Sequence, residues 1–385
     1  NITDIDDKII QSAKENKISI KDLTTKINNN FQEDCNYLIC EKPSFQPKAT
    51  ENIKEMIEMI SILVKKGFAY ESNNHIYFEV NKFKDYGKLS NKKIDDLISG
   101  SRVEVSSNKK NAEDFVLWKP SNEDEPSWTS PWGKGRPGWH LECSAMSKKF
   151  LGDEFDVHGG GIDLIFPHHE NEIAQVEAVT CKTFARHWFH IAHLMVEGQK
   201  MSKSLGNLYT LSDLAEKGYH PQEIRYLLLS GNYRQPLNFT FDSLGAARKA
   251  IAKLTDFASR FGFEYNENSQ VKKDFGPFYP VQEALLTDLN TPEALGRLFR
   301  LVRELTEAWH RGEFNGETDK IKGVHEGYQA CLDAFGLVVD AKAQESVDIP
   351  SDIQEMAQKR WQSKCNKNWA GWVGGRFQFP CGLRE

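Results

Sequence analysis

The feature that most constrains the fold is a short apolar strand that leads into glycines and then into a helix. Glu154-Phe-Asp-Val157 has the composition of a strand, and His158-Gly-Gly-Gly161 follows it directly. The next helix is expected to begin near Pro167, because proline is favoured at the first helical position. A strand, a glycine-rich turn and a helix in this order are typical of doubly wound α/β sheets. The predicted fold class is therefore α/β, with a Rossmann-like domain.

Composition limits the kinds of protein that this chain can be. Its 385 residues are 39% hydrophobic, and no apolar run is long enough to cross a membrane. The seven cysteines are scattered and never spaced Cys-x-x-Cys, which favours a reducing, cytoplasmic compartment and a metal site of mixed ligands. The net charge of −6 provides no overall basic field, so any contact with nucleic acid must come from a local patch.

The first third of the chain predicts helices and an inserted α+β module. Helices are expected at Asp6–Glu15 and at Glu51–Lys66, the second capped by Thr50 and stopped by Gly67. The second helix carries an apolar stripe made of Ile53, Met56, Ile57, Ile60, Leu63 and Val64. Strands are predicted at Ala69–Glu71, Ile76–Val80, Arg102–Val105 and Phe115–Trp118.

The remainder of the chain alternates loops and helices. Proline, glycine and serine between Pro120 and Gly138 predict a long loop before a helix at His140–Phe150. From Asp242 the pattern becomes helical. Helices are expected at Ser243–Phe261, at Pro292–Arg311 after a Thr291 cap, and at Asp319–Phe335, followed by a polar linker at Val338–Pro350 and a last helix at Asp352–Trp369.

A lysine-rich turn carries the strongest chemical pattern. Lys200-Met-Ser-Lys-Ser204 lies between Gly198 and Gly206, which would serve as hinges. Two lysines three residues apart can neutralise the charge that builds on departing pyrophosphate. Lys-x-x-Lys-Ser alone is as typical of an ordinary solvated turn, so the spacing leaves both interpretations open.

A second pattern, His168-His-Glu-Asn-Glu172, combines metal-ligand residue types at a helix start. His168 and Glu172 share one helix face, and Cys143 lies on the preceding predicted helix. A cysteine, a histidine and a glutamate suit Zn²⁺, although four ligands are wanted and three are visible. Taken alone, His and Glu at this spacing are more often a surface pair, and a lone cysteine is more often a small buried hydrophobe.

The glycine run itself admits two interpretations. His158 and Gly159, Gly160 and Gly161 could lie against phosphate or ribose, because glycine lets backbone N–H groups approach a ligand. A tight structural turn explains the glycines equally well. Asp163 could hold a substrate ammonium group or cap a helix.

Several long stretches together resemble cysteinyl-tRNA synthetases, a family of class I aminoacyl-tRNA synthetases. The similar stretches are Asn1-Ile-Thr-Asp-Ile-Asp-Asp-Lys-Ile, Gly138-Trp-His-Leu-Glu-Cys143-Ser-Ala-Met, Asp156 to Gln175, Glu197 to Asn207, and Asp288-Leu-Asn-Thr-Pro-Glu-Ala-Leu. The resemblance covers roughly residues 1–369, and the His-His-Glu-Asn-Glu block joined to the lysine pentamer is highly specific.

The resemblance implies a reaction and its cofactors. The family activates L-cysteine with ATP and Mg²⁺ and transfers it to tRNA(Cys), so tRNA(Cys), cysteine and ATP are the expected partners of a monomeric protein. One zinc ion would select the cysteine thiolate. The zinc ligands would be Cys143, His168 and Glu172.

The resemblance also assigns roles to individual residues. Lys203, with Lys200, would act in catalysis by contacting ATP, and His158 with Gly159, Gly160 and Gly161 would lie against the adenylate. Thr3, Trp139 and Asp163 would line the cysteine pocket. Arg360 and Trp369 would contact tRNA, where an aromatic ring can stack on an unpaired base.

The same resemblance divides the chain into predicted domains. These are residues 1–48, part of the catalytic Rossmann-like domain; 49–125, an inserted connective module; 126–190, the second half of the catalytic domain; 191–241, the lysine loop and stem-contact region; 242–337, a helical bundle; and 338–385, a small anticodon-binding region with an atypical tail after Trp369.

Two departures from the family pattern lead to an expectation about activity. The family's His-Ile-Gly-His sequence and a fourth zinc-ligand cysteine belong before Asn1, and the chain opens with Asn rather than Met. The chain is therefore expected to be an inactive fragment. Alternatives are a cysteine ligase of mycothiol synthesis, which charges an amino sugar, and a non-catalytic zinc- or RNA-binding module.

Overall fold

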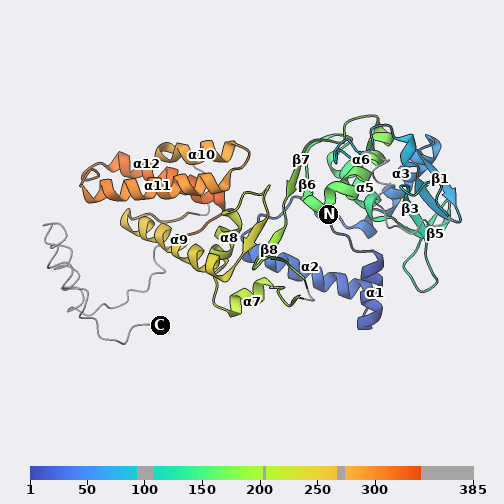
Figure 1. Ribbon diagram of the computed structural model, residues 1–385, viewed down its shortest axis with the longest axis horizontal. Coiled ribbons are helices and arrows are strands. Elements are labelled where there is room, and N and C mark those ends of the chain that lie inside the picture. Colours follow the sequence, from blue (N-terminus) through green and yellow to red (C-terminus); the bar gives the residue numbers. More distant parts are fainter. Residues whose placement is uncertain (93–107, 203–204, 267–273, 340–385) are drawn as a thin grey trace.

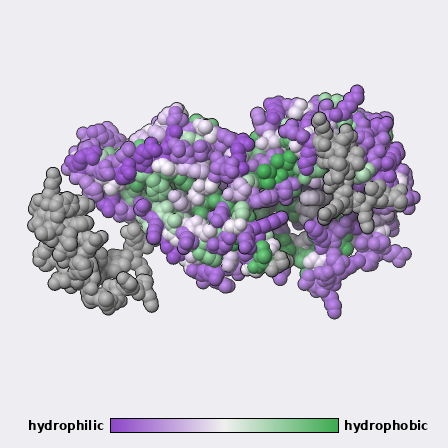
Figure 2. Space-filling model, viewed as in Figure 1, coloured by the Kyte–Doolittle hydropathy of each residue, from purple (hydrophilic) through white to green (hydrophobic). Residues whose placement is uncertain are grey.

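The structure, a computed structural model, describes residues 1–92, 108–202, 205–266 and 274–339. Figure 1 shows an elongated molecule, with an α/β part at one end, a helical bundle at the other and a small mixed region between them. Polar residues dominate the face shown in Figure 2, and apolar residues gather mainly near the middle of the molecule. Among the described helices, none has both the length and the apolar character needed to cross a membrane.

The N-terminal helices are defined by local caps. Helix α1 spans Asp7–Asn16 and is capped by the Asp6 carboxylate, which accepts a hydrogen bond from the Ile9 amide. Helix α2, Ile20–Tyr37, is absent from the sequence prediction and contains no fully buried residue. Helix α3, Ile53–Lys65, follows a 3₁₀ turn at Ala49–Glu51.

The predicted Thr50 cap of α3 is wrong. Asn52 occupies the cap position, and its side chain makes no capping hydrogen bond to the helix, whereas the Thr50 hydroxyl donates to the Asp4 carboxylate at 2.6 Å. Gly67 ends the helix region with a φ of 79°, as predicted. The predicted stripe is largely confirmed, except that Met59 is buried and Val64 is exposed.

An antiparallel five-stranded sheet packs beside α3 and α5, with the order β1-β2-β3-β5-β4 (Figure 1). Its strands are β1 Ala69–Ser72, β2 His75–Phe78, β3 Phe115–Pro120, β4 Trp128–Ser130 and β5 Gly133–Pro137. The loop expected over residues 120–138 is therefore wrong, because β4 and β5 form a hairpin that pairs with β3. The sheet also continues beyond the predicted module boundary at residue 125.

A parallel pair of strands forms the centre of the α/β part. Strand β6, Phe155–Gly161, pairs with β7, Ala185–Ile191, and helix α6, Glu170–Thr180, connects them. Between β6 and α6 lie a 3₁₀ turn at Ile162–Leu164 and a π turn at Ile165–His169. Helix α5, Trp139–Leu151, packs against α6 and confirms the prediction for this segment.

The region between the two ends of the molecule contains a small sheet and two short helices. Strands β8 Leu194–Val196, β9 Gln199–Lys200 and β10 Leu237–Phe239 form the sheet, with β8 parallel to β10. Helices α7 Leu211–Glu216 and α8 Pro221–Leu229 flank it, and neither was predicted. Arg225 links this region to α2 and α12 by donating to the carbonyls of Leu38 and Phe335.

Four helices build the bundle, and their apolar faces enclose a second core. They are α9 Phe241–Arg260, α10 Tyr279–Leu286, α11 Thr291–His310 and α12 Thr318–Phe335. The three helices predicted here are confirmed, whereas α10 was missed. Asn290, not Thr291, caps α11 by accepting from the Glu293 amide. The predicted strand at 102–105, most of the linker at 338–350 and the last helix at 352–369 lie outside the described residues.

Candidate active site

The three residues predicted as metal ligands converge in the structure. Cys143 lies on α5, and His168 and Glu172 lie one turn apart at the start of α6. Their ligand atoms, one from each residue, all lie within 4.8 Å of one another. Thiol, imidazole and carboxylate donors at this spacing fit Zn²⁺. Packing between α5 and α6, which spacing along the chain does not encode, brings the three together.

Glu172 supplies an independent indication that a cation belongs here. Its carboxylate is fully buried and accepts no hydrogen bond of good geometry from any described residue. The Nε2 atoms of His168 and His158 lie 2.7 and 3.2 Å from its oxygens. A buried carboxylate is costly without a partner, and a divalent cation would satisfy it.

Imidazole rings surround this carboxylate on several sides. His158, His169 and Glu172 form a second group of donor atoms within 4.8 Å of one another. Two further histidines extend the cluster. His169 Nδ1 lies 2.8 Å from His190 Nε2, and His168 Nδ1 lies 2.8 Å from His140 Nδ1. His140 and His190 were not predicted as site residues, because only strand pairing and helix packing place them there.

Burial controls the protonation of this cluster. It lowers the pKa of His140 to about 3, assisted by the charge of His168. It also lowers the pKa of His169 to about 3, with smaller contributions from neighbouring histidines. The pKa of the Cys143 thiol is raised well above its usual value, first by burial and then by Glu172 and Glu142. His140 and His169 therefore stay neutral, and a cation bound at Cys143 would deprotonate its thiol.

The predicted glycine turn is wrong, because His158 to Gly161 form the second half of strand β6. A side chain at Gly160 would place its Cβ 2.9 Å from the His169 ring, and one at Gly159 would meet the Phe189 carbonyl at 3.2 Å. Glycine at these positions lets β7 and His169 approach the strand closely. His158 points to Glu172 rather than standing free beside a glycine turn.

Two of the three residues predicted to line a cysteine pocket, Trp139 and Thr3, lie close to the metal-ligand group. The Trp139 ring is half exposed, and its centroid lies 4.2 Å from that of His168. Thr3 lies beside Glu142, the neighbour of Cys143, and counteracts in part the rise that burial causes in the pKa of the Glu142 carboxyl. Asp163 is exposed just after the end of β6. It lies so close to Gly161 that a Cβ added to Gly161 would be 2.5 Å from the Asp163 Oδ1 atom.

Glu142 is a site residue that the sequence prediction missed. It is almost completely buried, and burial raises the pKa of its carboxyl to about 8. Nearby, the Asn1 side-chain amide donates to the Cys143 sulfur at 3.3 Å. The only signal in the sequence is the position of Glu142 next to the cysteine, which is too weak to identify it.

The lysine loop follows the hairpin of β8 and β9. Lys200 lies at the end of β9 and is exposed, whereas Lys203 lies outside the described residues. The predicted hinges Gly198 and Gly206 both have positive φ angles, 74° and 63°. The Asn207 side chain holds the two ends of the loop together, accepting from the Ser202 amide at 2.9 Å and donating to the Lys200 carbonyl at 3.2 Å. Arg360 and Trp369 also lie outside the described part of the chain.

Comparison with protein families identifies two domains in the chain. Residues 1–249 match the family described as the tRNA synthetases class I (C) catalytic domain, and residues 280–339 match the DALR domain. Two solved structures of Mycobacterium tuberculosis methionyl-tRNA synthetase share the fold at 14% sequence identity. Their TM-scores are 0.55 and 0.53, with 85% and 84% of this chain and 79% of each solved chain covered. Fold and site thus define a class I aminoacyl-tRNA synthetase, which confirms the predicted fold class.

Curated relatives narrow the assignment within that class. The chain is 53% identical to the cysteine–tRNA ligase of Pelagibacter ubique over 302 residues, covering 78% of this chain and 64% of the relative. It is 45% identical to that of Opitutus terrae and 50% identical to that of Acinetobacter baylyi, covering 96% of this chain and 78% and 80% of these relatives. The chain belongs to the cysteine–tRNA ligase family, as its resemblance predicted. It spans less than two thirds of the first of these relatives.

Proposed function

We propose that this chain acts in an enzyme that activates L-cysteine with ATP and transfers it to tRNA(Cys). The observation that carries the proposal is the convergence of Cys143, His168 and Glu172 within 4.8 Å, inside the segment that matches the class I (C) catalytic domain. A sulfur, a nitrogen and an oxygen donor suit a metal that must also accept a substrate sulfur.

We propose one Zn²⁺ per chain, held by these three residues. When bound, it would accept the substrate thiolate and so separate cysteine from serine by metal–sulfur affinity. An apolar pocket alone discriminates poorly between side chains of similar size. Neutral His140 and His169 side chains would keep positive charge away from the metal.

The substrate would be positioned by residues close to this group. The half-exposed Trp139 ring, next to His168, would cover one side of the cysteine. Thr3, beside Glu142, would contact the amino acid. The exposed Asp163 carboxylate would pair with the substrate ammonium group.

ATP and Mg²⁺ would bind along the ends of β6 and the lysine loop. His158 and Gly159 to Gly161 would lie against the adenylate, since glycines allow a ligand to approach the backbone. Lys200 and Lys203 would stabilise the charge on pyrophosphate as it leaves. The Asn207 side chain, bonded to Ser202 and Lys200, would help to hold Lys200 in place.

The partner on the nucleic-acid side would be tRNA(Cys), with Arg360 and Trp369 as contacts near the anticodon. A DALR domain at residues 280–339 supports tRNA over the amino sugar of the mycothiol relative, which needs no such domain. The intact lysine pentamer argues against a non-catalytic module. We further propose a cytoplasmic monomer, and the domain boundaries predicted from the sequence stay part of this proposal.

The test is cysteine-dependent exchange between ATP and pyrophosphate, followed by charging of tRNA(Cys), in the protein that contains this chain. Lys203→Ala should lower the exchange rate by about 10²–10³-fold, because it removes a charged contact to the transition state. Cysteine affinity should stay nearly unchanged. Lys182→Ala, a control at an exposed lysine paired with Asp153, should leave both unchanged. A Lys203→Ala rate within a few-fold of wild type would refute the role of the loop.

A further inference from the structure

The C-terminal end of helix α2 brings two cysteines together. The helix ends at Tyr37, and Ile39 then adopts a left-handed conformation with a φ of 56°. The Cys40 amide donates to the Cys35 carbonyl at 2.9 Å, and the Ile39 amide donates to the Asn36 carbonyl at 3.0 Å. These two hydrogen bonds define a Schellman turn, in which the side chains at the positions of Cys35 and Cys40 commonly contact each other.

The spacing of the two cysteines along the chain does not encode this contact. On a regular α-helix, side chains five residues apart point about 140° away from each other around the helix axis. The left-handed residue reverses the chain and removes that separation. The conformation is unfavourable for isoleucine, which is branched at Cβ, so other contacts must stabilise the turn.

Arg225 of α8 provides the main contacts to this turn. Its Nη1 atom donates to the Leu38 carbonyl at 2.7 Å and to the Ile39 carbonyl at 3.3 Å. The Tyr37 hydroxyl donates to the Tyr219 carbonyl at 3.1 Å, just before α8. These bonds hold the end of α2 against the region between the two ends of the molecule (Figure 1). They keep the turn in the shape that brings the two thiols together.

Both thiols are free, and reagents can reach them. Cys40 is exposed and Cys35 is half-buried. Burial raises the pKa of the Cys35 thiol, and repulsion from Cys40 and then from Asp34 adds to the rise. Repulsion between the two sulfur atoms is a consequence of their closeness, and a bond between them would remove it. Among the described cysteines, this is the one pair that shares a turn, since the others lie on or next to α5, α6 and α12.

We infer that Cys35 and Cys40 form a redox pair that reacts with a low-molecular-weight disulfide and is converted to an internal disulfide. The Cys40 thiolate attacks one sulfur of the small disulfide, whose S–S bond breaks and releases one small thiolate. The Cys35 thiol then loses its proton to water, its thiolate attacks the Cys40 sulfur, and the second small thiolate leaves. The two cysteines are oxidised, the small disulfide is reduced to two thiols, and these take up the two protons that the cysteines lose.

The reaction would report the redox state of the surroundings at the junction between α2 and α8. In a reducing compartment the pair stays as two thiols, and it is oxidised only when small disulfides accumulate. The new bond would cross-link the turn whose carbonyls accept from Arg225, and so would fix that junction. The inference uses no part of the proposed function.

The test exposes the full chain to glutathione buffers of stepped disulfide-to-thiol ratio and maps its tryptic peptides by mass spectrometry. Residues 27–48 form one tryptic peptide, which contains Cys35 and Cys40 and no other cysteine. In the wild type, this peptide should lose two hydrogens and resist alkylation until it is reduced. Cys35→Ser should stop at a glutathione adduct on Cys40, because the resolving thiol is gone. Cys181→Ser, which removes an exposed thiol outside the turn, is the matched control and should behave as the wild type.

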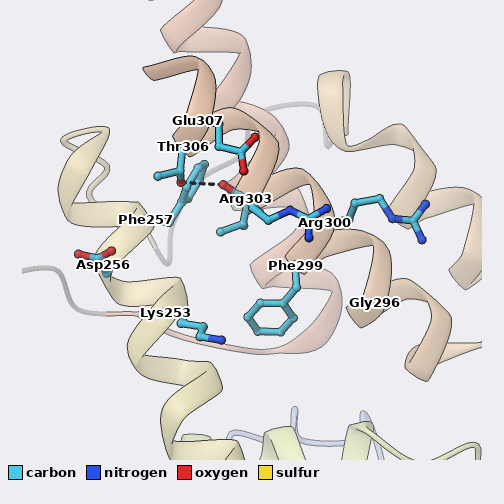
Figure 3. A pocket seen from close by; sticks show the side chains of 10 residues that line it. Lys253, Asp256, Phe257, Gly296, Phe299, Arg300, Arg303, Thr306 and Glu307 are labelled. Carbon is cyan, nitrogen blue, oxygen red and sulfur yellow. Dashed lines mark hydrogen bonds between the residues drawn. The ribbon is translucent and has the colours of Figure 1, made fainter. Parts of the chain in front are cut away.

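A second place on the protein can attract glutathione disulfide, which is anionic at neutral pH. It is the groove between α9 and α11, lined in part by Lys253, Arg300 and Arg303 (Figure 3). No cysteine is among the described residues that line it. Binding in the groove therefore leaves the mass of the 27–48 peptide unchanged, and the peptide map reports on the thiol pair alone.

A synthetic peptide of residues 27–48 measures what the fold contributes. Because the turn holds the two thiols close together, the folded chain should form the disulfide with an equilibrium constant at least about tenfold larger than that of the peptide. Equal equilibrium constants would overturn the inference, and so would a wild-type reaction that stops at the glutathione adduct. None of these measurements involves cysteine activation, so the failure of either proposal leaves the other intact.

Discussion

The histidine cluster around Glu172 and the bundle of α9 to α12 differ in where they place polar side chains: the cluster buries them, and the bundle keeps most of them at the surface. In the cluster, His168, His169 and Glu172 are 4%, 2% and 0% exposed, so groups that can carry charge are taken out of water. In the bundle, the buried positions are mostly aromatic or aliphatic, and arginines such as Arg260 and Arg311 form ion pairs at the surface. Buried polar groups without full hydrogen bonding destabilise a fold. The cluster is therefore adapted to chemistry at some cost in stability, whereas the bundle buries mainly apolar side chains, which stabilises the molecule.

The largest effect expected in this comparison comes from the bundle core. Phe278 is fully buried and packs edge-on against Phe257 and near Tyr328. Phe278→Ala should lower the free energy of unfolding by about 3–5 kcal/mol, through lost burial and the cavity left behind. Denaturant unfolding measures the change, and zinc content of the folded fraction should not change. A loss below about 1 kcal/mol would show that the bundle contributes little to stability.

The cluster should respond in the opposite way, with loss of metal and little loss of stability. Cys143→Ser should weaken zinc binding at least about 100-fold, because it removes a thiolate ligand. The unfolding free energy of the metal-free protein should change by no more than about 1 kcal/mol, since the two side chains have similar size. Cys181→Ser, at an exposed cysteine outside the cluster, is the control. Equal zinc content in the Cys143 variant and the control would reject the ligand assignment.

Both regions were predictable where local pattern determines structure. Helices α11 and α12 follow an apolar period of 3.6 residues, and the β1–β2 hairpin follows from paired asparagines at its turn, both of which have positive φ. His168 and Glu172 converge because i,i+4 spacing on a helix brings them together. These features require only interactions between neighbours in the sequence.

Prediction failed where distant segments decide the structure. Gly159 to Gly161 have the composition of a turn, yet pairing with Phe189 to Ile191 makes them a strand. Strand β5 contains two glycines and one proline, a composition typical of a loop, and its pairing with β3 overrides that pattern. His140, His190 and Glu142 join the site through helix packing and strand pairing, so no spacing rule identifies them. Helix α2 lacks a buried face, which explains why its weak pattern was not recognised.

A smaller effect should appear in the acid sensitivity of the cluster. Because burial lowers the pKa of His140 to about 3, the ring stays neutral in the folded, metal-free protein. The unfolded chain takes up a proton near the usual pKa of 6.5, so stability is lost as pH falls from about 6.5 toward 3. For this one histidine, the loss should be on the order of 1–2 kcal/mol between pH 7 and pH 5.

Unfolding midpoints of the metal-free protein at several pH values measure this loss. His140→Asn should make the acid limb shallower, because the variant lacks the group that binds the proton on unfolding. An acid limb identical to that of the wild type would show that His140 is already protonated in the folded protein. That result would contradict the neutral cluster.

The smallest expected effect on stability comes from replacing glycines inside the bundle helices. Gly296→Ala should raise the free energy of unfolding by about 0.5–1 kcal/mol, since alanine favours the helix and its Cβ meets no atom within 4 Å. The same change at Gly245 of α9, also in open space, should stabilise the protein by a similar amount.

Gly327→Ala provides the opposite limit, because its Cβ would lie 2.4 Å from the Phe275 carbonyl and should destabilise the bundle. Denaturant unfolding of the three variants measures these changes. Gly296→Ala and Gly245→Ala variants that are no more stable than the wild type would show that helix propensity does not limit the stability of α9 and α11.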